Sequence, residues 1–282
     1  MIQLTDVTKY YGRTRAVDGL SLAISQPGIY CLLGKNGAGK TTMLKLIAGH
    51  INASAGDIRV SGREVDMMHM PENVHFIESN APQFNMKLRS LFRAAAELSD
   101  SDLEFSLALA ARFKLDLNKR YRQLSFGMKV MVNTILGMAS QKQILFLDEP
   151  VLGFDAVMRK TFYDLLLESC QARPKIVIIS THLIDEMATV AEKLLIVNDG
   201  KLLLYSGMDE IEEKAYTVTG LAEPVEAAVA GLNVIGETKA GGFVSKFVFD
   251  RRVEGGAQYS VANLGLQDFF VSLVGAQQEE AS

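Results

Sequence analysis

The sequence predicts an α/β fold in which a β-rich N-terminal part, a helical segment and a parallel sheet precede a small α+β region. Short apolar runs at residues 29–33, 144–147, 176–179 and 194–197 have the length of buried strands. Helical segments separate the last three of these runs, which is the pattern of βαβ units. After Gly207 the composition changes, and this change predicts a second, smaller domain.

The composition indicates a large core and no unusual charge. Of the 282 residues, 48% are hydrophobic, so a main domain with an appendage is the natural expectation. The net charge of −4 and the pI near 5.7 give no electrostatic reason to expect nucleic acid as a partner. The N-terminus has no signal-peptide pattern, and the apolar runs are far shorter than the roughly 20 residues that span a bilayer. We therefore expect a soluble, cytoplasmic chain that reaches a membrane only through another subunit.

The first sixty residues are predicted to contain several strands and one helix. Residues 2–7, 16–24 and 57–60 have strand-like patterns, and residues 29–33 lead into a glycine-rich loop. Residues 40–50 have the apolar spacing of a helix.

The remaining elements define the expected domains. The main domain is expected at residues 1–207, with a helical subdomain at about 86–142, and a small α+β domain at 208–282. Helices are predicted at 88–98, 102–115, 125–140, 224–230 and 266–274, and strands of the second domain at 215–219, 233–235, 243–249 and 258–261.

A phosphate-binding motif follows the strand at residues 29–33. Residues 34–41 read Gly-Lys-Asn-Gly-Ala-Gly-Lys-Thr and fit G-x-x-x-x-G-K-[ST] at every fixed position. The glycines let the backbone wrap a phosphate, Lys40 reaches the β- and γ-phosphates, and the hydroxyl of Thr41 ligates Mg²⁺. The expected ATP contacts are Gly34, Asn36, Gly37, Ala38, Gly39, Lys40, Thr41 and Thr42.

Two acidic residues end a later apolar strand. Asp148 follows residues 144–147, where a carboxylate can hold Mg²⁺, and Glu149 can act as general base toward the attacking water. His182 follows another apolar run and is expected at the same edge of the sheet, where it could donate a hydrogen bond to the γ-phosphate. A lone histidine after a strand is more often structural, and this position favours the functional interpretation.

A second anion-binding feature lies between these motifs. Ser125 can cap a helix, and Gly127 follows two positions later. The free N–H groups and the positive end of such a helix favour an anion. The two cysteines, Cys31 and Cys170, are read as reduced thiols, and the Met67–Met70 cluster around His69 as a loop rather than a metal site.

The ordered motifs resemble the ATP-binding subunit of ABC transporters, over about residues 1–207. They lie at residues 34–41, 124–128, 144–149, 153–155 and 181–182. The resemblance implies a P-loop NTPase fold of the ABC type and ATP hydrolysis. It also implies a dimer in which Ser125 and Gly127 of one copy close on ATP held by Lys40 of the other.

The resemblance implies further roles. Tyr11, before Gly12, would stack on adenine, with the neighbouring Tyr10 as an alternative. Asp155 would lie in the loop that communicates between the two ATP sites. The implied partners are a transmembrane permease and a second ATP-binding subunit, identical or homologous, which would place the chain at the cytoplasmic face of the membrane.

The chain departs from the family pattern in three places, one of which is Lys35, where the family commonly has proline. The signature usually reads Leu-Ser-Gly-Gly-Gln, and here Phe126 and Met128 replace its first glycine and its glutamine. The glutamine that normally touches Mg²⁺ and the permease is replaced by Glu78, with Ser79 and Gln83 as alternative equivalents. A glutamate at this position resembles the bacterial exporters that confer protection from lantibiotic-type peptide antibiotics.

The predicted function is ATP hydrolysis that drives a separate permease, for export of an antibiotic peptide or a small molecule. The alternatives are the ATPase subunit of an importer, a soluble ABC ATPase without a transport role, and a P-loop enzyme of another class such as a small-molecule kinase. A single phosphate-binding motif and only 108 positions between Lys40 and Asp148 (148 − 40) disfavour the translation and repair types.

Overall fold

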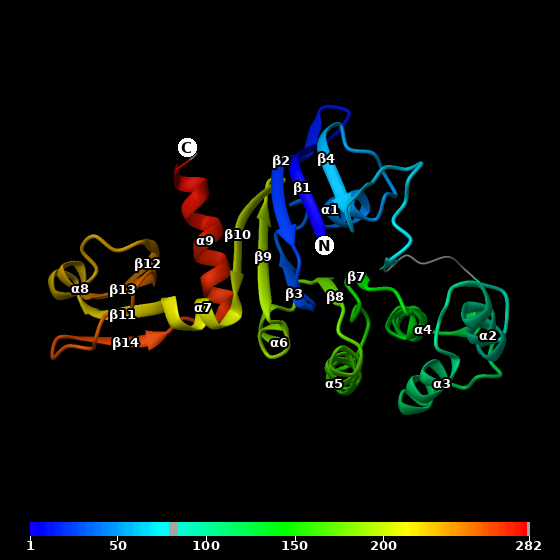
Figure 1. Cartoon of the computed structure of the whole chain (residues 1–282). Coiled ribbons are helices and arrows are strands. Elements are labelled where there is room, and N and C mark those ends of the chain that lie inside the picture. The colour runs from blue at the N-terminus through cyan, green and yellow to red at the C-terminus, as the bar shows by residue number, and fades with distance from the viewer. Residues whose placement is uncertain (79–83, 281–282) are drawn as a thin grey trace. The chain divides into compact units, whose positions relative to one another are not determined.

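The computed structural model describes residues 1–78 and 84–280, and it divides into two compact units (Figure 1). Unit 1 consists of Met1–His182 and Val197–Leu203, and unit 2 of Leu183–Ile196 and Leu204–Ser282. The elements up to residue 180 are β1 (Ile2–Tyr11), β2 (Thr14–Ile24), β3 (Gly28–Leu33), α1 (Lys40–Ile47), β4 (Ala55–Val60), β5 (Arg63–Glu64), β6 (Val74–Ile77), α2 (Leu88–Leu98), α3 (Leu103–Arg112), a 3₁₀ turn (Tyr121–Gln123), α4 (Phe126–Ala139), β7 (Ile144–Asp148), α5 (Ala156–Ala172) and β8 (Ile176–Ser180). The elements that follow are α6 (Ile184–Ala188), β9 (Lys193–Asn198), β10 (Lys201–Gly207), α7 (Met208–Lys214), β11 (Ala215–Leu221), α8 (Ala222–Ala228), β12 (Val234–Ala240), β13 (Phe243–Phe249), β14 (Tyr259–Asn263) and α9 (Leu266–Glu280).

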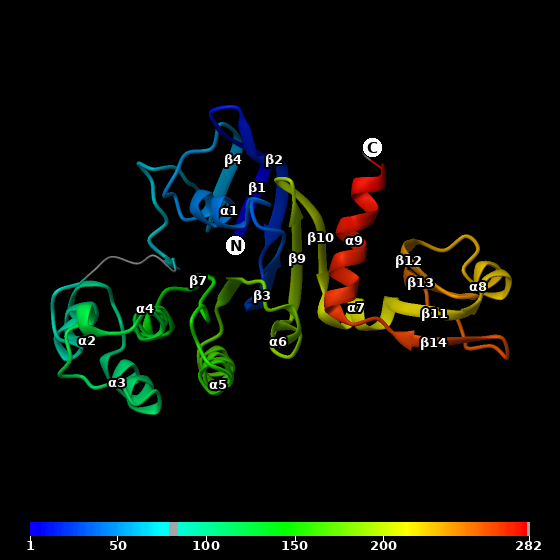
Figure 2. The same ribbon diagram turned by 180° about the vertical axis from the view of Figure 1, so that it is seen from behind.

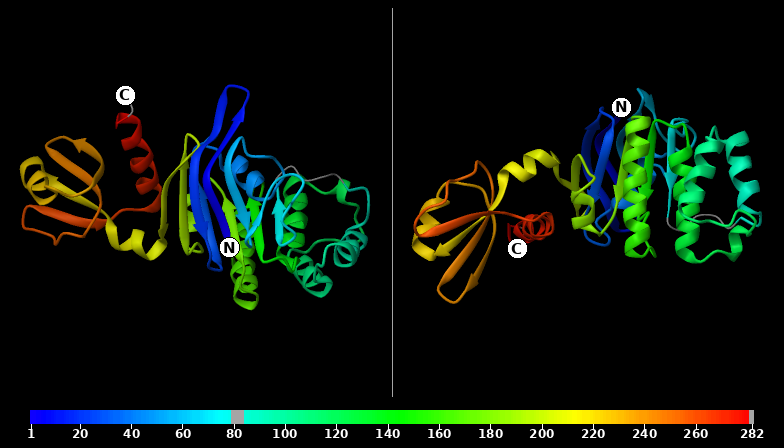
Figure 3. Two further views of the ribbon diagram at one scale, coloured as in Figure 1. Left: turned by 45° about the horizontal axis from the view of Figure 1, so that its top comes forward. Right: turned by 90° about the horizontal axis from the view of Figure 1, so that it is seen from below.

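An antiparallel sheet forms the N-terminal part of unit 1. Its strand order is β2-β1-β4-β5, and the long β1–β2 pair is seen in the left panel of Figure 3. In β1, Ile2 and Leu4 are buried whereas their neighbours Gln3 and Thr5 are exposed. This alternation buries one face of the sheet and leaves the other in solvent.

A second sheet, whose strands in unit 1 have the order β3-β8-β7-β6, carries the candidate site. Strands β3, β8, β7 and β6 pair in parallel. Every residue of β7 and of β8 is buried, as expected of strands covered on both faces. Because the four strands are parallel, their carboxyl ends meet at one edge, where the ligands of α/β folds bind.

The helices α2, α3 and α4 pack together within unit 1, as Figure 1 shows. Asp102 caps α3 by accepting a hydrogen bond from the N–H of Phe105 at 2.9 Å. Within this group the buried side chains of Tyr121 and Asn133 are hydrogen bonded. A buried polar pair of this kind fixes the packing because either partner alone would be left unsatisfied.

Unit 2 contains an antiparallel sheet of order β12-β13-β11-β14, which is seen from behind in Figure 2. The helix α8 contacts β11 and β13, and α9 contacts β12 and α6. Phe269 of α9 lies with its ring centroid 5.0 Å from that of Phe249. The core beneath α8 consists of Tyr216, Val218, Val225, Val229 and Val248.

The structure differs from the sequence prediction at several elements. The helix after the phosphate loop ends at Ile47 rather than at residue 50, because Gly49 adopts a left-handed φ of 72° and turns the chain. The strand predicted at 233–235 extends through Ala240, since it pairs with β13 over its whole length. The short elements β10 and α7 were missed, and their few residues carry little periodicity. None of the helices within the described ranges is long and apolar enough to cross a membrane.

Candidate nucleotide-binding site

The phosphate loop connects β3 to α1 in unit 1. Gly39 has a φ of 103°, and a Cβ atom there would collide with the backbone oxygen of Ala16. Only glycine fits this position. The Nζ of Lys40 lies inside the loop and donates to the backbone oxygen of Gly34 at 2.7 Å. The lysine is therefore held where a phosphate bound by the loop N–H groups would meet it.

Asp148 ends β7 directly beside the start of α1. Its Oδ2 accepts a hydrogen bond from Oγ1 of Thr41 at 2.8 Å, and its Oδ1 accepts from the hydroxyl of Ser180 at the end of β8. The carboxylate is only 8% exposed. Three elements far apart in the sequence thus fix one buried acidic group at the carboxyl edge of the sheet.

Glu149 is the next residue, and its backbone has a left-handed φ of 51°, which is uncommon for a residue other than glycine. The N–H of Glu149 donates to the oxygen of Ser180 at 2.9 Å and holds this conformation. The Nδ1 of His182 lies 2.9 Å from Oε2 of Glu149. The histidine therefore contacts the candidate general base at the carboxyl edge of the sheet, a contact that the sequence did not predict.

The charges of the site influence one another. Burial raises the pKa of Glu149 above its ordinary value, and His182 and Lys40 oppose this shift. Burial also lowers the pKa of Lys40, with Glu149 and Asp148 opposing the shift. A carboxyl with a raised pKa beside a phosphate loop is suited to proton transfer.

Glu78 follows β6 at the same edge. Its Oε2 lies 2.9 Å from Nζ of Lys45, and its Oε1 lies 3.8 Å from Nδ1 of His50. Of the three candidates for the glutamine-loop position, only this one can be placed, since Ser79 and Gln83 lie outside the described residues.

The phosphate loop, Asp148, Glu149 and Glu78 surround a pocket of about 450 Å³. The predicted residues that line it are Asn36, Gly37, Ala38, Gly39, Lys40, Thr41, Thr42, Glu78, Asp148 and Glu149. Sequence reasoning missed Ala16 and Lys45, which also line the pocket, and Ser180, which holds Asp148. The position of Ser180, immediately before Thr181 and His182 at a strand end, was a usable signal.

The predicted adenine contact is not among the lining residues. Tyr11 is 48% exposed and its ring lies beneath Nζ of Lys9, whereas Tyr10 is 41% exposed and its ring lies beneath the guanidinium of Arg15. Both tyrosines belong to β1, and the choice between them stays a prediction.

The signature segment lies outside this pocket. Ser125 caps α4 by accepting from the N–H of Met128 at 3.3 Å, as predicted for a helix N-terminus. Ser125 is exposed and Phe126 is 48% exposed, whereas Gly127 is buried. A Cβ atom on Gly127 would lie 2.6 Å from the backbone oxygen of Gly153, so the start of α4 is packed against the turn that follows Glu149.

The donor atoms near Thr41 fit a magnesium ion. Thr41 and Asp148 offer a hydroxyl and a carboxylate, which are the hard oxygen ligands that Mg²⁺ prefers. In the parts of the chain that the structure describes, no three His, Cys, Asp or Glu side chains gather as a metal cluster. A magnesium site here would therefore depend on substrate phosphates for further ligands, as is usual for Mg²⁺.

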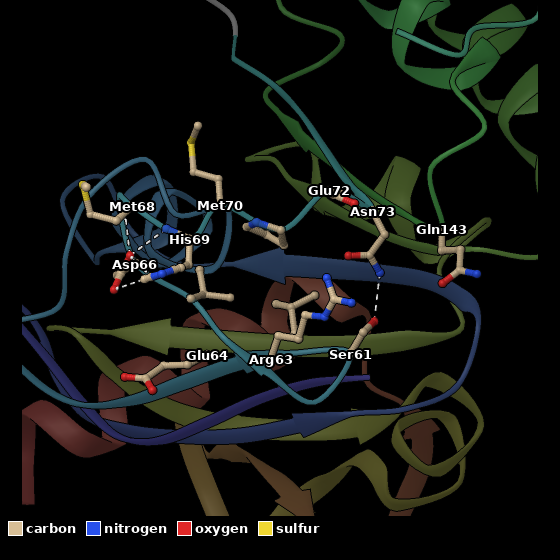
Figure 4. A pocket seen from close by; sticks show the side chains of 13 residues that line it. Ser61, Arg63, Glu64, Asp66, Met68, His69, Met70, Glu72, Asn73 and Gln143 are labelled. Carbon is tan, nitrogen blue, oxygen red and sulfur yellow. Dashed lines mark hydrogen bonds and ion pairs between the residues drawn. The ribbon is translucent and has the colours of Figure 1, made fainter.

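A larger pocket, of about 1010 Å³, lies at the amino ends of β6 and β7, where Asn73 and Gln143 line it. Figure 4 shows Asp66 and His69 joined on one side of it and the Ser61–Asn73 hydrogen bond on the other. Met68 in this loop is 87% exposed. The pocket is at the edge of the sheet opposite to the phosphate loop, and it holds none of the predicted site residues.

The chain is similar in sequence to known proteins. Residues 17–152 match the family model described as ABC transporter. The chain is 28% identical over 223 residues to the ABC transporter ATP-binding protein YtrB of Bacillus subtilis, covering 76% of this chain and 74% of that protein. It is 25% identical over 218 residues to the lantibiotic transport ATP-binding protein SrtF of Streptococcus pyogenes, covering 76% of this chain and 95% of that protein.

The fold also matches solved ATP-binding cassettes. A dimeric cassette in a post-hydrolysis state with ADP and phosphate bound superposes with a TM-score of 0.64 at 19% identity, covering 74% of this chain and 99% of that one. The predicted fold class is thereby confirmed. The matched residues, the ordered motifs and the cassette fold all agree with an ATP-binding subunit of an ABC transporter.

Proposed function

We propose that this protein hydrolyses ATP as a dimer and drives a separate membrane permease, for export of an antibiotic peptide or a small molecule. The second subunit would be another copy or a close homologue, and the protein would lie at the cytoplasmic face of the membrane through the permease. Residues 1–207 would carry the ATPase, and residues 208–282 a separate small domain.

One observation supports the proposed dimer. The pocket formed by the phosphate loop, Asp148 and Glu149 is not lined by Ser125 or Gly127, although Ser125 forms an exposed helix N-terminus suited to an anion. The phosphate-facing group of one chain is therefore available to a nucleotide held by another. Two such chains, related by a two-fold axis, would complete two sites at once.

The chemistry follows from the residues around the pocket. The loop N–H groups and Lys40 would bind and orient the β- and γ-phosphates. Glu149 would accept a proton from the water that attacks the γ-phosphorus in line, and His182 would hold Glu149 and donate to the γ-phosphate. Thr41, Asp148 and Glu78 would hold Mg²⁺, and the bound ion would neutralise charge on the phosphates.

Export is supported by two features. The relative from Streptococcus pyogenes is named as a lantibiotic transport ATP-binding protein. Glu78, which lines the pocket in the glutamine-loop region, is the residue type expected of such exporters. An importer subunit and a non-transport ABC ATPase are the alternatives. Co-purification of a multi-span permease with the protein would separate the two transport functions from the non-transport ATPase.

The dimer is tested with Glu149→Gln, which should stop hydrolysis but not ATP binding. Size-exclusion chromatography with light scattering should show a monomer without nucleotide and a dimer with ATP. The Glu149→Gln, Lys40→Ala double variant is the matched control and should stay monomeric with ATP. A Glu149→Gln protein that binds ATP and remains monomeric would contradict the proposed function.

A further inference from the structure

The ion pair between Lys45 and Glu78 has no role in the site as described so far. Lys45 lies in the last turn of α1, the helix that begins with Lys40 and Thr41. Glu78 follows β6, whose neighbour β7 ends at Asp148. The 2.9 Å contact therefore ties the helix of the phosphate loop to the end of a neighbouring strand.

Both partners face the nucleotide pocket. Lys45 and Glu78 are among its lining residues, and their side chains are 30% and 33% exposed. A pair in such a position is partly removed from water, so its charges are less screened than those of a surface pair. The second oxygen of Glu78 faces His50, at 3.8 Å, which follows the same helix.

The charges around the pocket bear on the binding of a polyanion. The lining side chains include three acids, Glu78, Asp148 and Glu149, and two bases, Lys40 and Lys45. A triphosphate adds further negative charge. Without Lys45 the carboxylate of Glu78 would stand uncompensated at the wall of a phosphate pocket, where like charges repel.

We propose that Lys45 is a positioning residue for Glu78: its ammonium group holds the carboxylate and makes a glutamate at this place compatible with ATP in the same pocket. The inference rests on the proposed function, because it concerns the binding of ATP. It predicts that the need for a cation at position 45 exists only while position 78 is an acid.

The alternative is that Lys45 acts on the phosphates directly. In that case its loss would weaken ATP binding whether or not Glu78 is charged. A double-mutant cycle separates the two, because only a coupled pair gives non-additive effects.

The experiment measures the dissociation constant of a fluorescent ATP analogue, with EDTA present, on the full-length protein. The variants are Lys45→Met, Glu78→Gln and the double variant, and thermal unfolding confirms that each is folded. Lys45→Met should weaken binding about fivefold or more, while the same change in the Glu78→Gln background should alter it less than about twofold. Lys45→Arg keeps the charge and should bind as wild type does.

Lys35 supplies the matched control, since it lies in the phosphate loop and does not pair with Glu78. Lys35→Met should have the same effect in both backgrounds. If Lys45→Met weakens binding of the ATP analogue equally in the wild-type and Glu78→Gln backgrounds, the proposal is overturned. Failure of the wild-type chain to bind the analogue at all would instead contradict the proposed function.

Discussion

The hydroxyl of Thr41 donates a 2.8 Å hydrogen bond to the carboxylate of Asp148, 107 positions further along the chain. This bond joins the first turn of α1 to the end of β7. Together with the Ser180 hydroxyl it gives each carboxylate oxygen of the buried Asp148 one hydrogen-bond partner. The site is therefore pre-formed before a ligand enters it.

Replacing Thr41 should show that ATP hydrolysis depends on its hydrogen bond to Asp148. Thr41→Val keeps the shape but removes the hydroxyl, so one oxygen of the buried Asp148 loses its partner and a candidate magnesium ligand disappears. We expect Thr41→Val to lower ATP hydrolysis about tenfold or more and Thr41→Ser to stay within about threefold of wild type. Steady-state hydrolysis against Mg²⁺ concentration measures both. Equal activity of the Val and Ser variants would contradict the role of the hydroxyl.

Glu149→Gln should stabilise the folded protein at neutral pH while it removes activity. Burial raises the pKa of Glu149 above its ordinary 4.5, so the folded state binds this proton more tightly than the unfolded state does. Ionisation therefore lowers stability as pH rises from about 4.5 through the raised pKa. The glutamine variant carries no such charge. Its unfolding temperature should exceed that of wild type at pH 7, and the difference should shrink toward pH 4.5.

Hydrolysis gives the second readout for the same variant. Loss of a general base should lower kcat by about 100-fold or more without a large change in ATP affinity. A glutamine variant that is less stable than wild type at pH 7 would show that burial does not disfavour the charged form of Glu149. A glutamine variant that is fully active would show that Glu149 is not the general base.

His75 should contribute to acid sensitivity in the opposite direction. Burial, with help from Lys142 and Lys175, lowers the pKa of His75 from 6.5 to about 4. The unfolded chain therefore binds more protons between these values, and the stability present above pH 6.5 is lost as pH falls toward 4. His75→Gln cannot gain this proton. Its unfolding temperature should fall less than that of wild type over that interval, and an identical fall would contradict the assignment.

Gly127 should tolerate no side chain. A Cβ atom there would lie 2.6 Å from the backbone oxygen of Gly153, so the signature segment and the turn after Glu149 would have to separate. We expect Gly127→Ala to destabilise the fold by about 1–3 kcal/mol in denaturant unfolding. Gly265→Ala is the matched control, because no atom stands within 4 Å of a Cβ at that position. Similar losses for the two variants would show that the contact is not responsible.

The sequence predicted the chemistry of this site better than its three-dimensional contacts. The motif at 34–41 and the acids after residues 144–147 could be read directly, because fixed spacing and strand-end position determine where their side chains lie. The roles of Ser180 and Lys45 could not, since each depends on which strands and helices become neighbours. Phe126 illustrates the limit differently: the sequence marked it as unusual, and only the structure shows that its ring lies where it would crowd a Cβ atom at Gly153.

The central claim is that Ser125 of one chain completes the ATP site of another, and mixing two inactive variants tests it most directly. The Lys40→Ala variant lacks the lysine of its own phosphate loop. In the Ser125→Arg variant, the arginine blocks the helix N-terminus that would contact ATP in the partner. Each should be inactive alone, whereas the mixed dimer contains one intact site, with Lys40 from one chain and Ser125 from the other. We predict that ATP hydrolysis reappears on mixing, at about half of the wild-type rate per mixed dimer, because one of its two sites is intact. Mixed dimers that form and hydrolyse no ATP would contradict the claim.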